Sequence, residues 1–169
     1  MIVVAILSIA AAVALPTAQP VAEFHADAAA GEVVHALRFA RENAQHSGEQ
    51  RLFDCDLQAN SITVLALTTS SNTTGTGKVV DHPFSGAPYR LTLNASPAGN
   101  NMVIMRCTFT YTDNATVASV AFDAAGNPVR GVGSGGTRTQ ALRSGQIVLG
   151  AGHVVRNVVI DGSGRVTVS

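Results

Sequence analysis

The sequence predicts an α+β fold in which one long N-terminal helix packs on an antiparallel β-sheet head domain. Three observations predict this fold. Apolar residues recur at helical spacing as far as Ser47. After Ser47, short alternating runs rich in β-branched residues are separated by turn-forming segments. No later segment keeps the helical period over the length of a helix, so the 169 residues are expected to form one helix followed by strands.

The composition narrows the class of protein. Charged residues make up 13% of the chain and apolar residues 46%, whereas disordered chains are polar and strongly charged. Eleven basic side chains balance eleven acidic ones, which excludes a globally basic protein that coats nucleic acid. One segment alone is apolar enough to enter a bilayer, which excludes a polytopic membrane protein.

The apolar excess collects at the start of the chain, where fourteen of the fifteen residues of Met1–Leu15 are apolar. At about 1.5 Å per residue this tract spans about 22 Å, less than the roughly 30 Å of a hydrocarbon core. We expect a membrane helix whose beginning, about six residues long, lies upstream of Met1. Two alternatives remain. One is a secretory signal peptide, although no basic residue precedes the tract, and the other is a buried core helix.

The helix is expected to continue beyond the apolar tract. Pro16 and Pro20 each lack a backbone donor, so we expect them to bend the helix. From there to Ser47, larger apolar residues alternate with charged ones, which is typical of an amphipathic helix. The predicted organisation is a transmembrane or filament-core half at 1–20, an amphipathic half at 21–47 and a β-rich head domain at 48–169.

The rest of the chain is expected to be β-structure. Two hairpins are indicated, one across Asp113 and Asn114 and one that closes the chain across 161–164. Turn-rich segments separate the expected strands. These strands are Arg51–Asp54, Ser61–Leu67, Lys78–Val80, Tyr89–Leu93, Met102–Tyr111, Val117–Asp123, Gln146–Leu149, His153–Ile160 and Arg165–Val168.

The first sixteen residues, MIVVAILSIAAAVALP, resemble the N-terminal segment of type IV pilins and of the pseudopilins of type II secretion. In that family the tract follows a processed Phe-Thr-Leu-Ile-Glu-Leu start, and Pro16 fits the proline that bends the helix. The resemblance implies that six residues of the mature chain precede Met1. Among them would be an N-methylated first residue and a glutamate that guides docking of the subunit.

Other segments resemble one branch of that family, the GspH/FimT-type minor pilins. The segment Leu37–Cys55 contains an Ala-Arg-x-x-Ala stretch that leads into a first strand ending in Cys, and 121–129 and 154–169 resemble the closing strands of that branch. The resemblance covers residues 1–55 and 119–169, and the middle of the chain is not distinctive.

The resemblance implies a single-pass protein of the bacterial inner membrane with its head in the periplasm. Its helix would later pack against other pilin or pseudopilin subunits in a pilus or pseudopilus. The implied function is that of a FimT-like minor pilin that takes part in type IV pilus assembly. The alternative within the family is a GspH-like minor pseudopilin of type II secretion. The alternative outside the family is a secreted β-rich binding domain with a cleaved signal peptide.

Cys55 and Cys107 both fall in expected strands. A periplasmic head would permit their oxidation, and a disulfide between them would stabilise the fold by about 4 kcal/mol through loop-closure entropy. The alternative is a pair of buried free thiols. A metal site is not expected, because neither Cys has a second Cys or a His at ligand spacing.

The sequence contains no motif of an enzyme or of a cofactor site. Its five His residues are scattered and none belongs to an HExxH pattern. The glycine-rich segment 131–136 lacks the Lys and the Ser or Thr of a phosphate-binding loop, so a plain loop is expected there. We therefore expect neither an enzyme nor a protein that binds a cofactor or a small-molecule substrate.

The basic residues are unevenly placed. Residues 1–100 hold five basic and eight acidic side chains, whereas residues 101–169 hold six Arg and three Asp. Some FimT-type pilins bind DNA through a C-terminal Gly-Arg-x-Arg stretch, and here Thr167 takes the place of its second Arg. Arginine suits phosphate contacts, so a DNA-binding patch is one expectation and solvation of strand ends and loops is the other. The candidate DNA-binding residues are Arg138, Arg143, Arg156 and Arg165.

Overall fold

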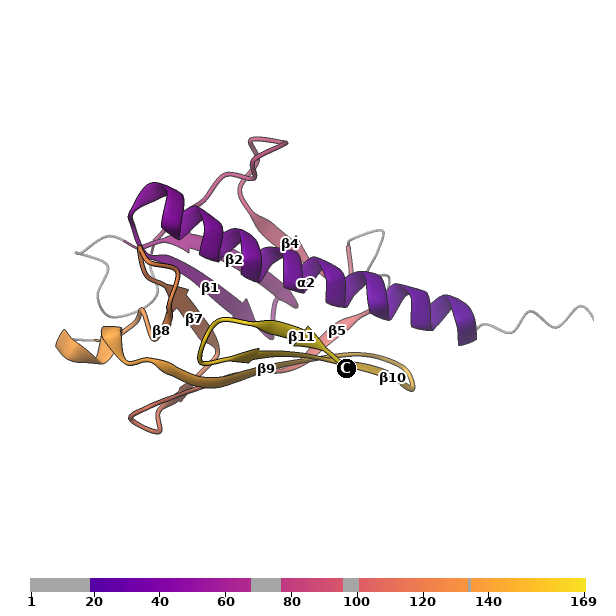
Figure 1. Cartoon of the computed structure of the whole chain (residues 1–169). Helices are drawn as coiled ribbons and strands as arrows, with labels where there is room; N and C mark the ends of the chain where they lie inside the picture. The colour runs from indigo at the N-terminus through magenta and orange to yellow at the C-terminus, as the bar shows by residue number, and fades with distance from the viewer. Residues whose placement is uncertain (1–18, 68–76, 96–100, 134) are drawn as a thin grey trace, which may run out of the picture.

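The computed structural model describes residues 19–67, 77–95, 101–133 and 135–169 (Figure 1). Helix α2 (Gln19–Ser47) lies against two antiparallel sheets, which together form the head. This arrangement is the predicted α+β fold. Met1–Leu15 and Pro16 lie outside the described residues, and within the described part of the chain no helix is long and apolar enough to cross a membrane.

Helix α2 buries a face of small side chains. Alanine has the highest helix propensity, and Ala29, Ala36 and Ala40 are fully buried, which lets the helix axis approach the sheets closely. The helix ends at Ser47, and the next residue, Gly48, has a φ of 69° and donates its N–H to the Ala44 carbonyl at 3.0 Å. The expected end at Ser47 is therefore confirmed.

Pro20 is the second residue of α2 as described. The bend expected at Pro16 and Pro20, and the division of the helix into two halves at residue 20, stay predictions.

The first sheet has six strands in the order β3-β2-β1-β7-β8, with β4 also paired to β2. Strands β1 and β2 form a hairpin whose register runs from the Arg51–Ala66 pair to the Asp56–Ser61 pair. The strands of this sheet are β1 (Arg51–Asp56), β2 (Ser61–Ala66), β3 (Lys78–Val79), β4 (Arg90–Thr92), β7 (Ser119–Phe122) and β8 (Pro128–Val129).

The second sheet has five strands in the order β11-β10-β9-β5-β6. Both expected hairpins are confirmed, because β5 pairs with β6 around the turn at 113–114 and β10 pairs with β11 around the turn at 161–164. The strands of this sheet are β5 (Val103–Tyr111), β6 (Thr116–Val117), β9 (Leu142–Ala151), β10 (Val154–Asp161) and β11 (Val166–Val168).

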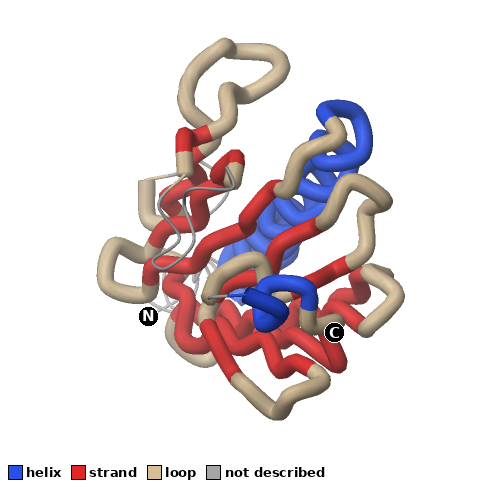
Figure 2. The backbone as a smooth tube through the Cα atoms, turned by 90° about the vertical axis from the view of Figure 1, so that its left-hand side faces the viewer, coloured by secondary structure: helices blue, strands red, loops and turns tan. Residues whose placement is uncertain are grey.

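The main core is formed by side chains of α2 and of both sheets. Figure 2 shows the arrangement of the helix and the sheets from the C-terminal end of the helix. Phe53 from the six-stranded sheet meets Phe109 from the five-stranded sheet edge to face, with ring centroids 6.2 Å apart. A second, smaller core cluster draws on residues of the six-stranded sheet and a neighbouring loop. It consists of Leu52, Leu65, Leu67, Ala121 and Val129.

Three segments differ from expectation. The strand expected over Val117–Asp123 is divided at Ala118 between β6 and β7, which belong to different sheets. A short 3₁₀ helix, η1 (Gly135–Thr139), begins within the segment 131–136, where a plain loop was expected. Strand β9 begins at Leu142 rather than Gln146, because its first residues are polar on the exposed side and hide the alternation.

Candidate functional site

Polar contacts hold α2 on the head at two distant points. Near the N-terminal end of the helix, Asp27 accepts a hydrogen bond from Nε of Arg156 on β10 at 2.6 Å. Near the other end, Arg41 donates to the carbonyl oxygen of Gly164 at 3.4 Å. Asp27 and Arg41 are about 21 Å apart along a helix. These two contacts therefore join the helix to the head across about half of the described length of α2.

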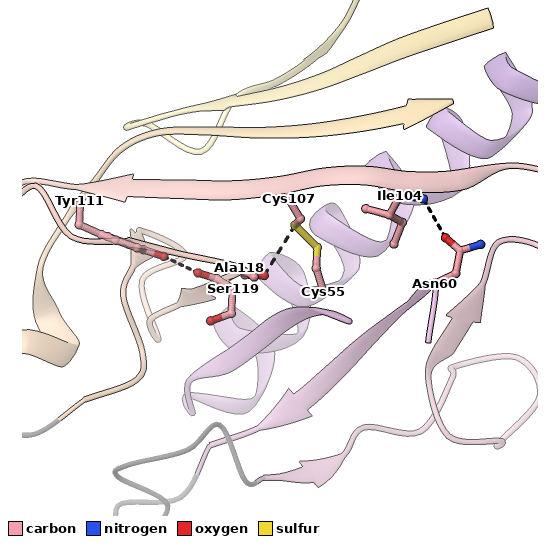
Figure 3. The surroundings of a disulfide bond; sticks show 7 residues. All are labelled: Cys55, Asn60, Ile104, Cys107, Tyr111, Ala118 and Ser119. Carbon is pink, nitrogen blue, oxygen red and sulfur yellow. Dashed lines mark hydrogen bonds between the residues drawn. A yellow bond between two sulfur atoms is a disulfide. The ribbon is translucent and has the colours of Figure 1, made fainter. Parts of the chain in front are cut away.

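A disulfide joins the two sheets (Figure 3). Cys55 on β1 and Cys107 on β5 have Cα atoms 6.4 Å apart, and both residues are buried. Sγ of Cys107 lies 3.6 Å from the carbonyl oxygen of Ala118, where the chain leaves one sheet for the other. A disulfide sulfur carries no proton, so this is a packing contact. Of the two alternatives left by the sequence, the structure has the disulfide.

Two polar side chains also connect the two sheets near the disulfide, and the sequence did not indicate either of them. Asn60 donates to the Met102 carbonyl at 2.8 Å and accepts from the Ile104 N–H at 2.7 Å. The buried Tyr111 hydroxyl donates to the Ser119 carbonyl at 2.7 Å, and burial raises the pKa of this tyrosine (Figure 3). An Asn in a turn and a Tyr in a strand are common, so no sequence signal marked either residue.

Two of the candidate DNA-binding residues, Arg143 and Arg165, lie at the same end of the five-stranded sheet. Asp161 at the end of β10 pairs with Ser144, next to Arg143, and Arg165 follows the turn after Asp161. Two strand spacings, about 10 Å, separate the Arg143 and Arg165 backbones. Both side chains are exposed, and Arg143 donates to the Asn114 side chain at 3.0 Å.

The other two candidates are engaged with other parts of the head. Arg156 pairs with Asp27 on α2. Arg138 in η1 donates to the Gly131 carbonyl at 3.0 Å and to the Gln50 side chain at 3.3 Å. The structure thus brings Arg143 and Arg165 to one end of a sheet, but it does not gather the four candidates into one exposed set.

Asp161 organises the turn that carries Arg165. Its carboxylate accepts hydrogen bonds from the Ser163 hydroxyl at 2.6 Å and from the Arg165 N–H at 3.1 Å. These hydrogen bonds, that of Ser163 first, lower the pKa of Asp161. At neutral pH an ionised carboxylate therefore lies beside Arg165 and reduces the positive potential that a phosphate would meet there.

The described surface offers little that could enclose a small ligand. In the described ranges no group of three or more His, Cys, Asp or Glu side chains could hold a metal ion. A hollow of about 280 Å³ lies beside α2, and its lining includes Glu32, His82 and Tyr89. It is smaller than the roughly 300–1,000 Å³ of typical small-molecule pockets.

Comparison with known proteins gives matches in structure alone. No protein-family profile matches the chain, and no curated protein matches its sequence. The type IV minor pilin FimU of Pseudomonas aeruginosa matches with a TM-score of 0.51 and 11% identity, over 85% of this chain and 87% of FimU. The minor pseudopilin EpsH of the Vibrio cholerae type II secretion system matches with a TM-score of 0.54 and 13% identity, over 86% of this chain and 96% of EpsH.

A second structure of EpsH gives the same TM-score of 0.54 at 12% identity, over 86% of this chain and 94% of EpsH. Such low identities show the fold and leave the activity to other arguments. The long helix, the two antiparallel sheets and these matches agree: the chain has a pilin-like fold of the GspH/FimT type, as its sequence predicts.

Proposed function

We propose that the chain is a pilin or pseudopilin, anchored in the inner membrane through its N-terminal helix and then incorporated into a filament. One observation carries the proposal. Helix α2, which follows the apolar tract Met1–Leu15 in the sequence, is packed on a head with the fold of minor pilins and pseudopilins. The tract and α2 would form one long element that inserts among other subunits, and the head would remain outside the helical core.

Burial of the apolar tract supplies the driving force in this proposal. Fourteen of its fifteen residues are apolar, and each Å² of apolar surface removed from water contributes about 25 cal/mol. Lipid covers that surface before assembly, and the helices of neighbouring subunits cover it afterwards. The helix therefore supplies the assembly function, and no catalytic step is required of the head.

Within this proposal we favour a FimT-like minor pilin of a type IV pilus over a GspH-like minor pseudopilin of type II secretion. The support is the exposed pair Arg143 and Arg165 at one end of the head, which gives a pilus subunit a surface for an anionic ligand. A minor pilin and a minor pseudopilin both match the fold. An experiment is therefore needed to distinguish the type IV pilus from the type II secretion system.

The test follows a tagged chain in the cells that make it. We expect the chain in the membrane fraction and in filaments sheared from the cells, and we expect deletion of 1–15 to remove it from both. Persistence of the Cys55–Cys107 disulfide in the deleted chain shows that the head is still folded. Release of a cleaved head into the medium would overturn the proposal and support the secreted binding domain.

Deletion of the gene separates the two machines. Loss of surface pili with unchanged protein secretion is the outcome expected for a minor pilin. Loss of secretion with unchanged pili would assign the chain to the secretion pseudopilus instead.

As a second activity, the end of the head with Arg143 and Arg165 is proposed to bind DNA phosphates. Two arginines whose backbones lie about 10 Å apart can contact separate phosphates, and Arg is suited to bidentate phosphate contacts. This contact would be sensitive to salt, because each neutralised phosphate releases counterions.

DNA retention by the full chain in detergent tests this activity. Arg143→Ala together with Arg165→Ala is expected to reduce retention at least tenfold and to lower the slope of log affinity against log salt by about 2. Arg156→Ala is the matched control, since Arg156 is engaged with Asp27. Absence of retention by the unmutated chain at low salt, or an equal loss from the control, would overturn the assignment.

A further inference from the structure

The disulfide lies in the middle of a line of contacts between the two sheets, which we name the seam. The seam consists of the Asn60 hydrogen bonds, the Cys55–Cys107 disulfide and the Tyr111 hydrogen bond (Figure 3). On β5, Ile104 lies three residues before Cys107, and Tyr111 lies four residues after it. At about 3.4 Å per residue the seam is therefore roughly 24 Å long. The disulfide thus has a polar contact between the sheets on each side of it.

The two sulfur atoms are enclosed in the closed head, the state in which the sheets are in contact. Cys55 and Cys107 are 6% and 4% exposed, and both belong to the main core cluster. The carbonyl oxygen of Ala118 accepts a hydrogen bond from the Cys55 N–H at 3.2 Å and lies 3.6 Å from Sγ of Cys107. Thiol–disulfide exchange requires a thiolate to attack a sulfur atom directly. The closed head therefore blocks this attack.

Access to the sulfur atoms requires more than a local movement of one strand. The Asn60 side chain contacts the Met102 carbonyl and the Ile104 N–H, and its own carbonyl accepts from the Leu93 N–H at 3.2 Å. At the other end of the seam, release of the buried Tyr111 hydroxyl from its carbonyl partner would leave a buried polar group unpaired, which is costly. Because the sheets are held on both sides of the disulfide, we expect the sulfur atoms to become accessible only when the sheets separate as whole units.

The same core holds α2 on the head. The core cluster that contains both cysteines also contains the buried helix residues Ala29, Val33 and Ala36. Separation of the sheets would expose this face of α2 to water, and apolar surface in contact with water is unfavourable. A chain with an open head therefore presents the inner face of α2 in addition to the apolar tract Met1–Leu15.

The order of the strands along the chain allows oxidation before closure. Both cysteines precede β9 in the sequence. Strand β9 supplies β5 with its long ladder, which runs from the Val103–Gly150 pair to the Tyr111–Leu142 pair. In a chain that emerges from its N-terminal end, the two thiols are therefore available before the five-stranded sheet can form. They are enclosed once it has formed.

We propose that the disulfide is a redox checkpoint: a thiol oxidant forms it while the sheets are apart, and closure of the head then protects it from reductants. The step is thiol–disulfide exchange with an oxidised dithiol protein. The thiolate of one cysteine attacks a sulfur of the oxidant's disulfide and displaces the other sulfur as a thiolate. The thiolate of the second cysteine then attacks the first in the mixed disulfide. The Cys55–Cys107 bond forms, and the oxidant leaves as a dithiol that has gained two electrons and the two thiol protons.

The checkpoint controls entry into filaments, and in this respect it rests on the proposed function. In an oxidised subunit with a closed head, the inner face of α2 is covered by the head. A reduced subunit lacks the stabilisation that the disulfide gives by constraining the unfolded chain. Its head opens more often and exposes the inner face of α2. Subunits are therefore expected to enter filaments only after they have met a thiol oxidant.

Reduction of the full chain, purified in detergent, tests the protection. Dithiothreitol is added at increasing urea concentrations below the unfolding transition, and the remaining disulfide is measured by alkylation and mass spectrometry. If the sheets separate as whole units, the logarithm of the reduction rate rises with urea with the same slope as the logarithm of the unfolding equilibrium constant. A reduction rate that is independent of urea in this range would show that a local opening exposes the sulfur atoms, and it would overturn the proposal.

Two variants provide a matched comparison. Tyr111→Phe removes one polar contact of the seam, whereas Gly131→Ala destabilises the head at a position outside the seam. We expect each substitution to raise the reduction rate by the same factor as it raises the unfolding equilibrium constant. A larger rise in the reduction rate for Tyr111→Phe alone would mean that the seam opens locally, against the proposal.

Timed oxidation tests the order of the two events. The reduced chain is unfolded in urea and diluted into refolding buffer, and oxidised glutathione is added at once or after folding has ended. We expect disulfide formation to be at least tenfold slower after late addition, because the thiols are then enclosed. A reduced chain that stays open also supports the proposal, since closure then requires the disulfide. Equal rates in a chain whose near-UV circular dichroism shows a closed head would overturn it.

The filament content of cells separates failure of the checkpoint from failure of the proposed function. Cys55→Ala with Cys107→Ala is expected to lower the amount of the chain in sheared filaments at least tenfold. Equal amounts of the variant and the unmutated chain would overturn the checkpoint and leave the proposed function standing. Absence of the unmutated chain from filaments would overturn the proposed function, and the reduction and oxidation measurements would still decide whether the disulfide precedes closure.

Discussion

The outer faces of the two sheets differ in what covers them. On the six-stranded sheet, Ala121 belongs to the second core cluster, and the backbone of Gly131 folds directly onto it. This face is therefore covered by the chain's own loop. On the five-stranded sheet, the described outer face presents three exposed apolar side chains, Val103, Met105 and Val155.

Strand length accounts for part of this difference. The five-stranded sheet is built around β5, β9 and β10, which have 9, 10 and 8 residues. The strands of the six-stranded sheet have no more than 6 residues. Long ladders supply many backbone hydrogen bonds, whereas short strands depend more on packing from both sides. The comparison teaches that a sheet with long strands can leave one face open to solvent.

The largest expected effect comes from separating the two sheets. Cys55→Ala with Cys107→Ala is expected to lower the free energy of unfolding by about 4 kcal/mol, because the 52-residue separation between them is no longer closed in the unfolded chain. Urea unfolding of the purified chain measures the loss, and reduction of the unmutated chain should reproduce it. A loss below about 1 kcal/mol would mean that the sheets are held together without the disulfide.

A pair of glycine substitutions compares the two outer faces directly. At Gly131 the φ is 70° and an added Cβ would overlap that of Ala121, so Gly131→Ala is expected to cost about 3 kcal/mol. At Gly150 the added Cβ meets the side chain of Met105, which is exposed and can move, so Gly150→Ala is expected to stay within about 0.5 kcal/mol. Equal losses in thermal or urea unfolding would contradict the difference between a covered and an open face.

A smaller effect is expected at the contact between α2 and the five-stranded sheet. Arg156→Ala removes the ion pair with Asp27, whose side chain is 64% exposed, and is expected to cause only a small loss of stability, because exposed ion pairs contribute little. The loss should shrink at high salt, because exposed ion pairs are screened. A salt-independent loss in urea unfolding would show instead that the arginine stem acts by packing.

The smallest expected effects on stability depend on pH. Substitution of an aspartate on one sheet is expected to stabilise the chain, and substitution of an aspartate on the other is expected to destabilise it. Burial, and secondarily repulsion from Asp56, raise the pKa of Asp54 on the same face of β1 as Leu52. Its ionisation therefore weakens the folded state as pH rises through that raised pKa. Asp54→Asn is expected to stabilise the chain at pH 7 by less than about 0.5 kcal/mol. The gain should disappear below about pH 4, where the carboxyl is protonated in both states.

Asp161 on the five-stranded sheet gives the opposite sign, because hydrogen bonds lower its pKa. Asp161→Ala is expected to destabilise the chain at pH 7, and this difference should fade as pH falls through the lowered pKa of the aspartate. Unfolding curves from pH 3 to pH 8 measure both variants. If both variants changed the stability at pH 7 in the same direction, that would contradict the assignment of Asp54 to a covered face and of Asp161 to an open one.

Much of the fold follows from local patterns. The end of α2 at Ser47, the turn at 113–114 and the turn at 161–164 all carry glycine, Asp or Asn in places where those residue types are favoured. The alternation of apolar and polar residues did not predict the start of β9, because this strand has one polar face and an irregular register with β5. It also could not divide the strands between two sheets, because alternation reports burial of a face and not the partner strand.

Less of the candidate site was predictable. The sequence indicated an Arg-rich C-terminal third, but strand register alone placed Arg143 beside Arg165 and directed Arg156 to Asp27. The sequence did not indicate that Phe84 and Met105 are exposed, because isolated apolar residues in a loop or strand usually belong to a core. Their exposure results from the way the β3–β4 loop and the bulged β5 strand are positioned.

The sequence by itself determined the plan of a long helix followed by an antiparallel β head, because helical and strand periods are local properties of neighbouring residues. It also determined that the apolar excess lies in Met1–Leu15. The tertiary structure alone decided which residues meet across the two sheets, which arginines share an end and which apolar side chains stay exposed. Those contacts join residues far apart along the chain, and their geometry depends on the packing of all the elements between them.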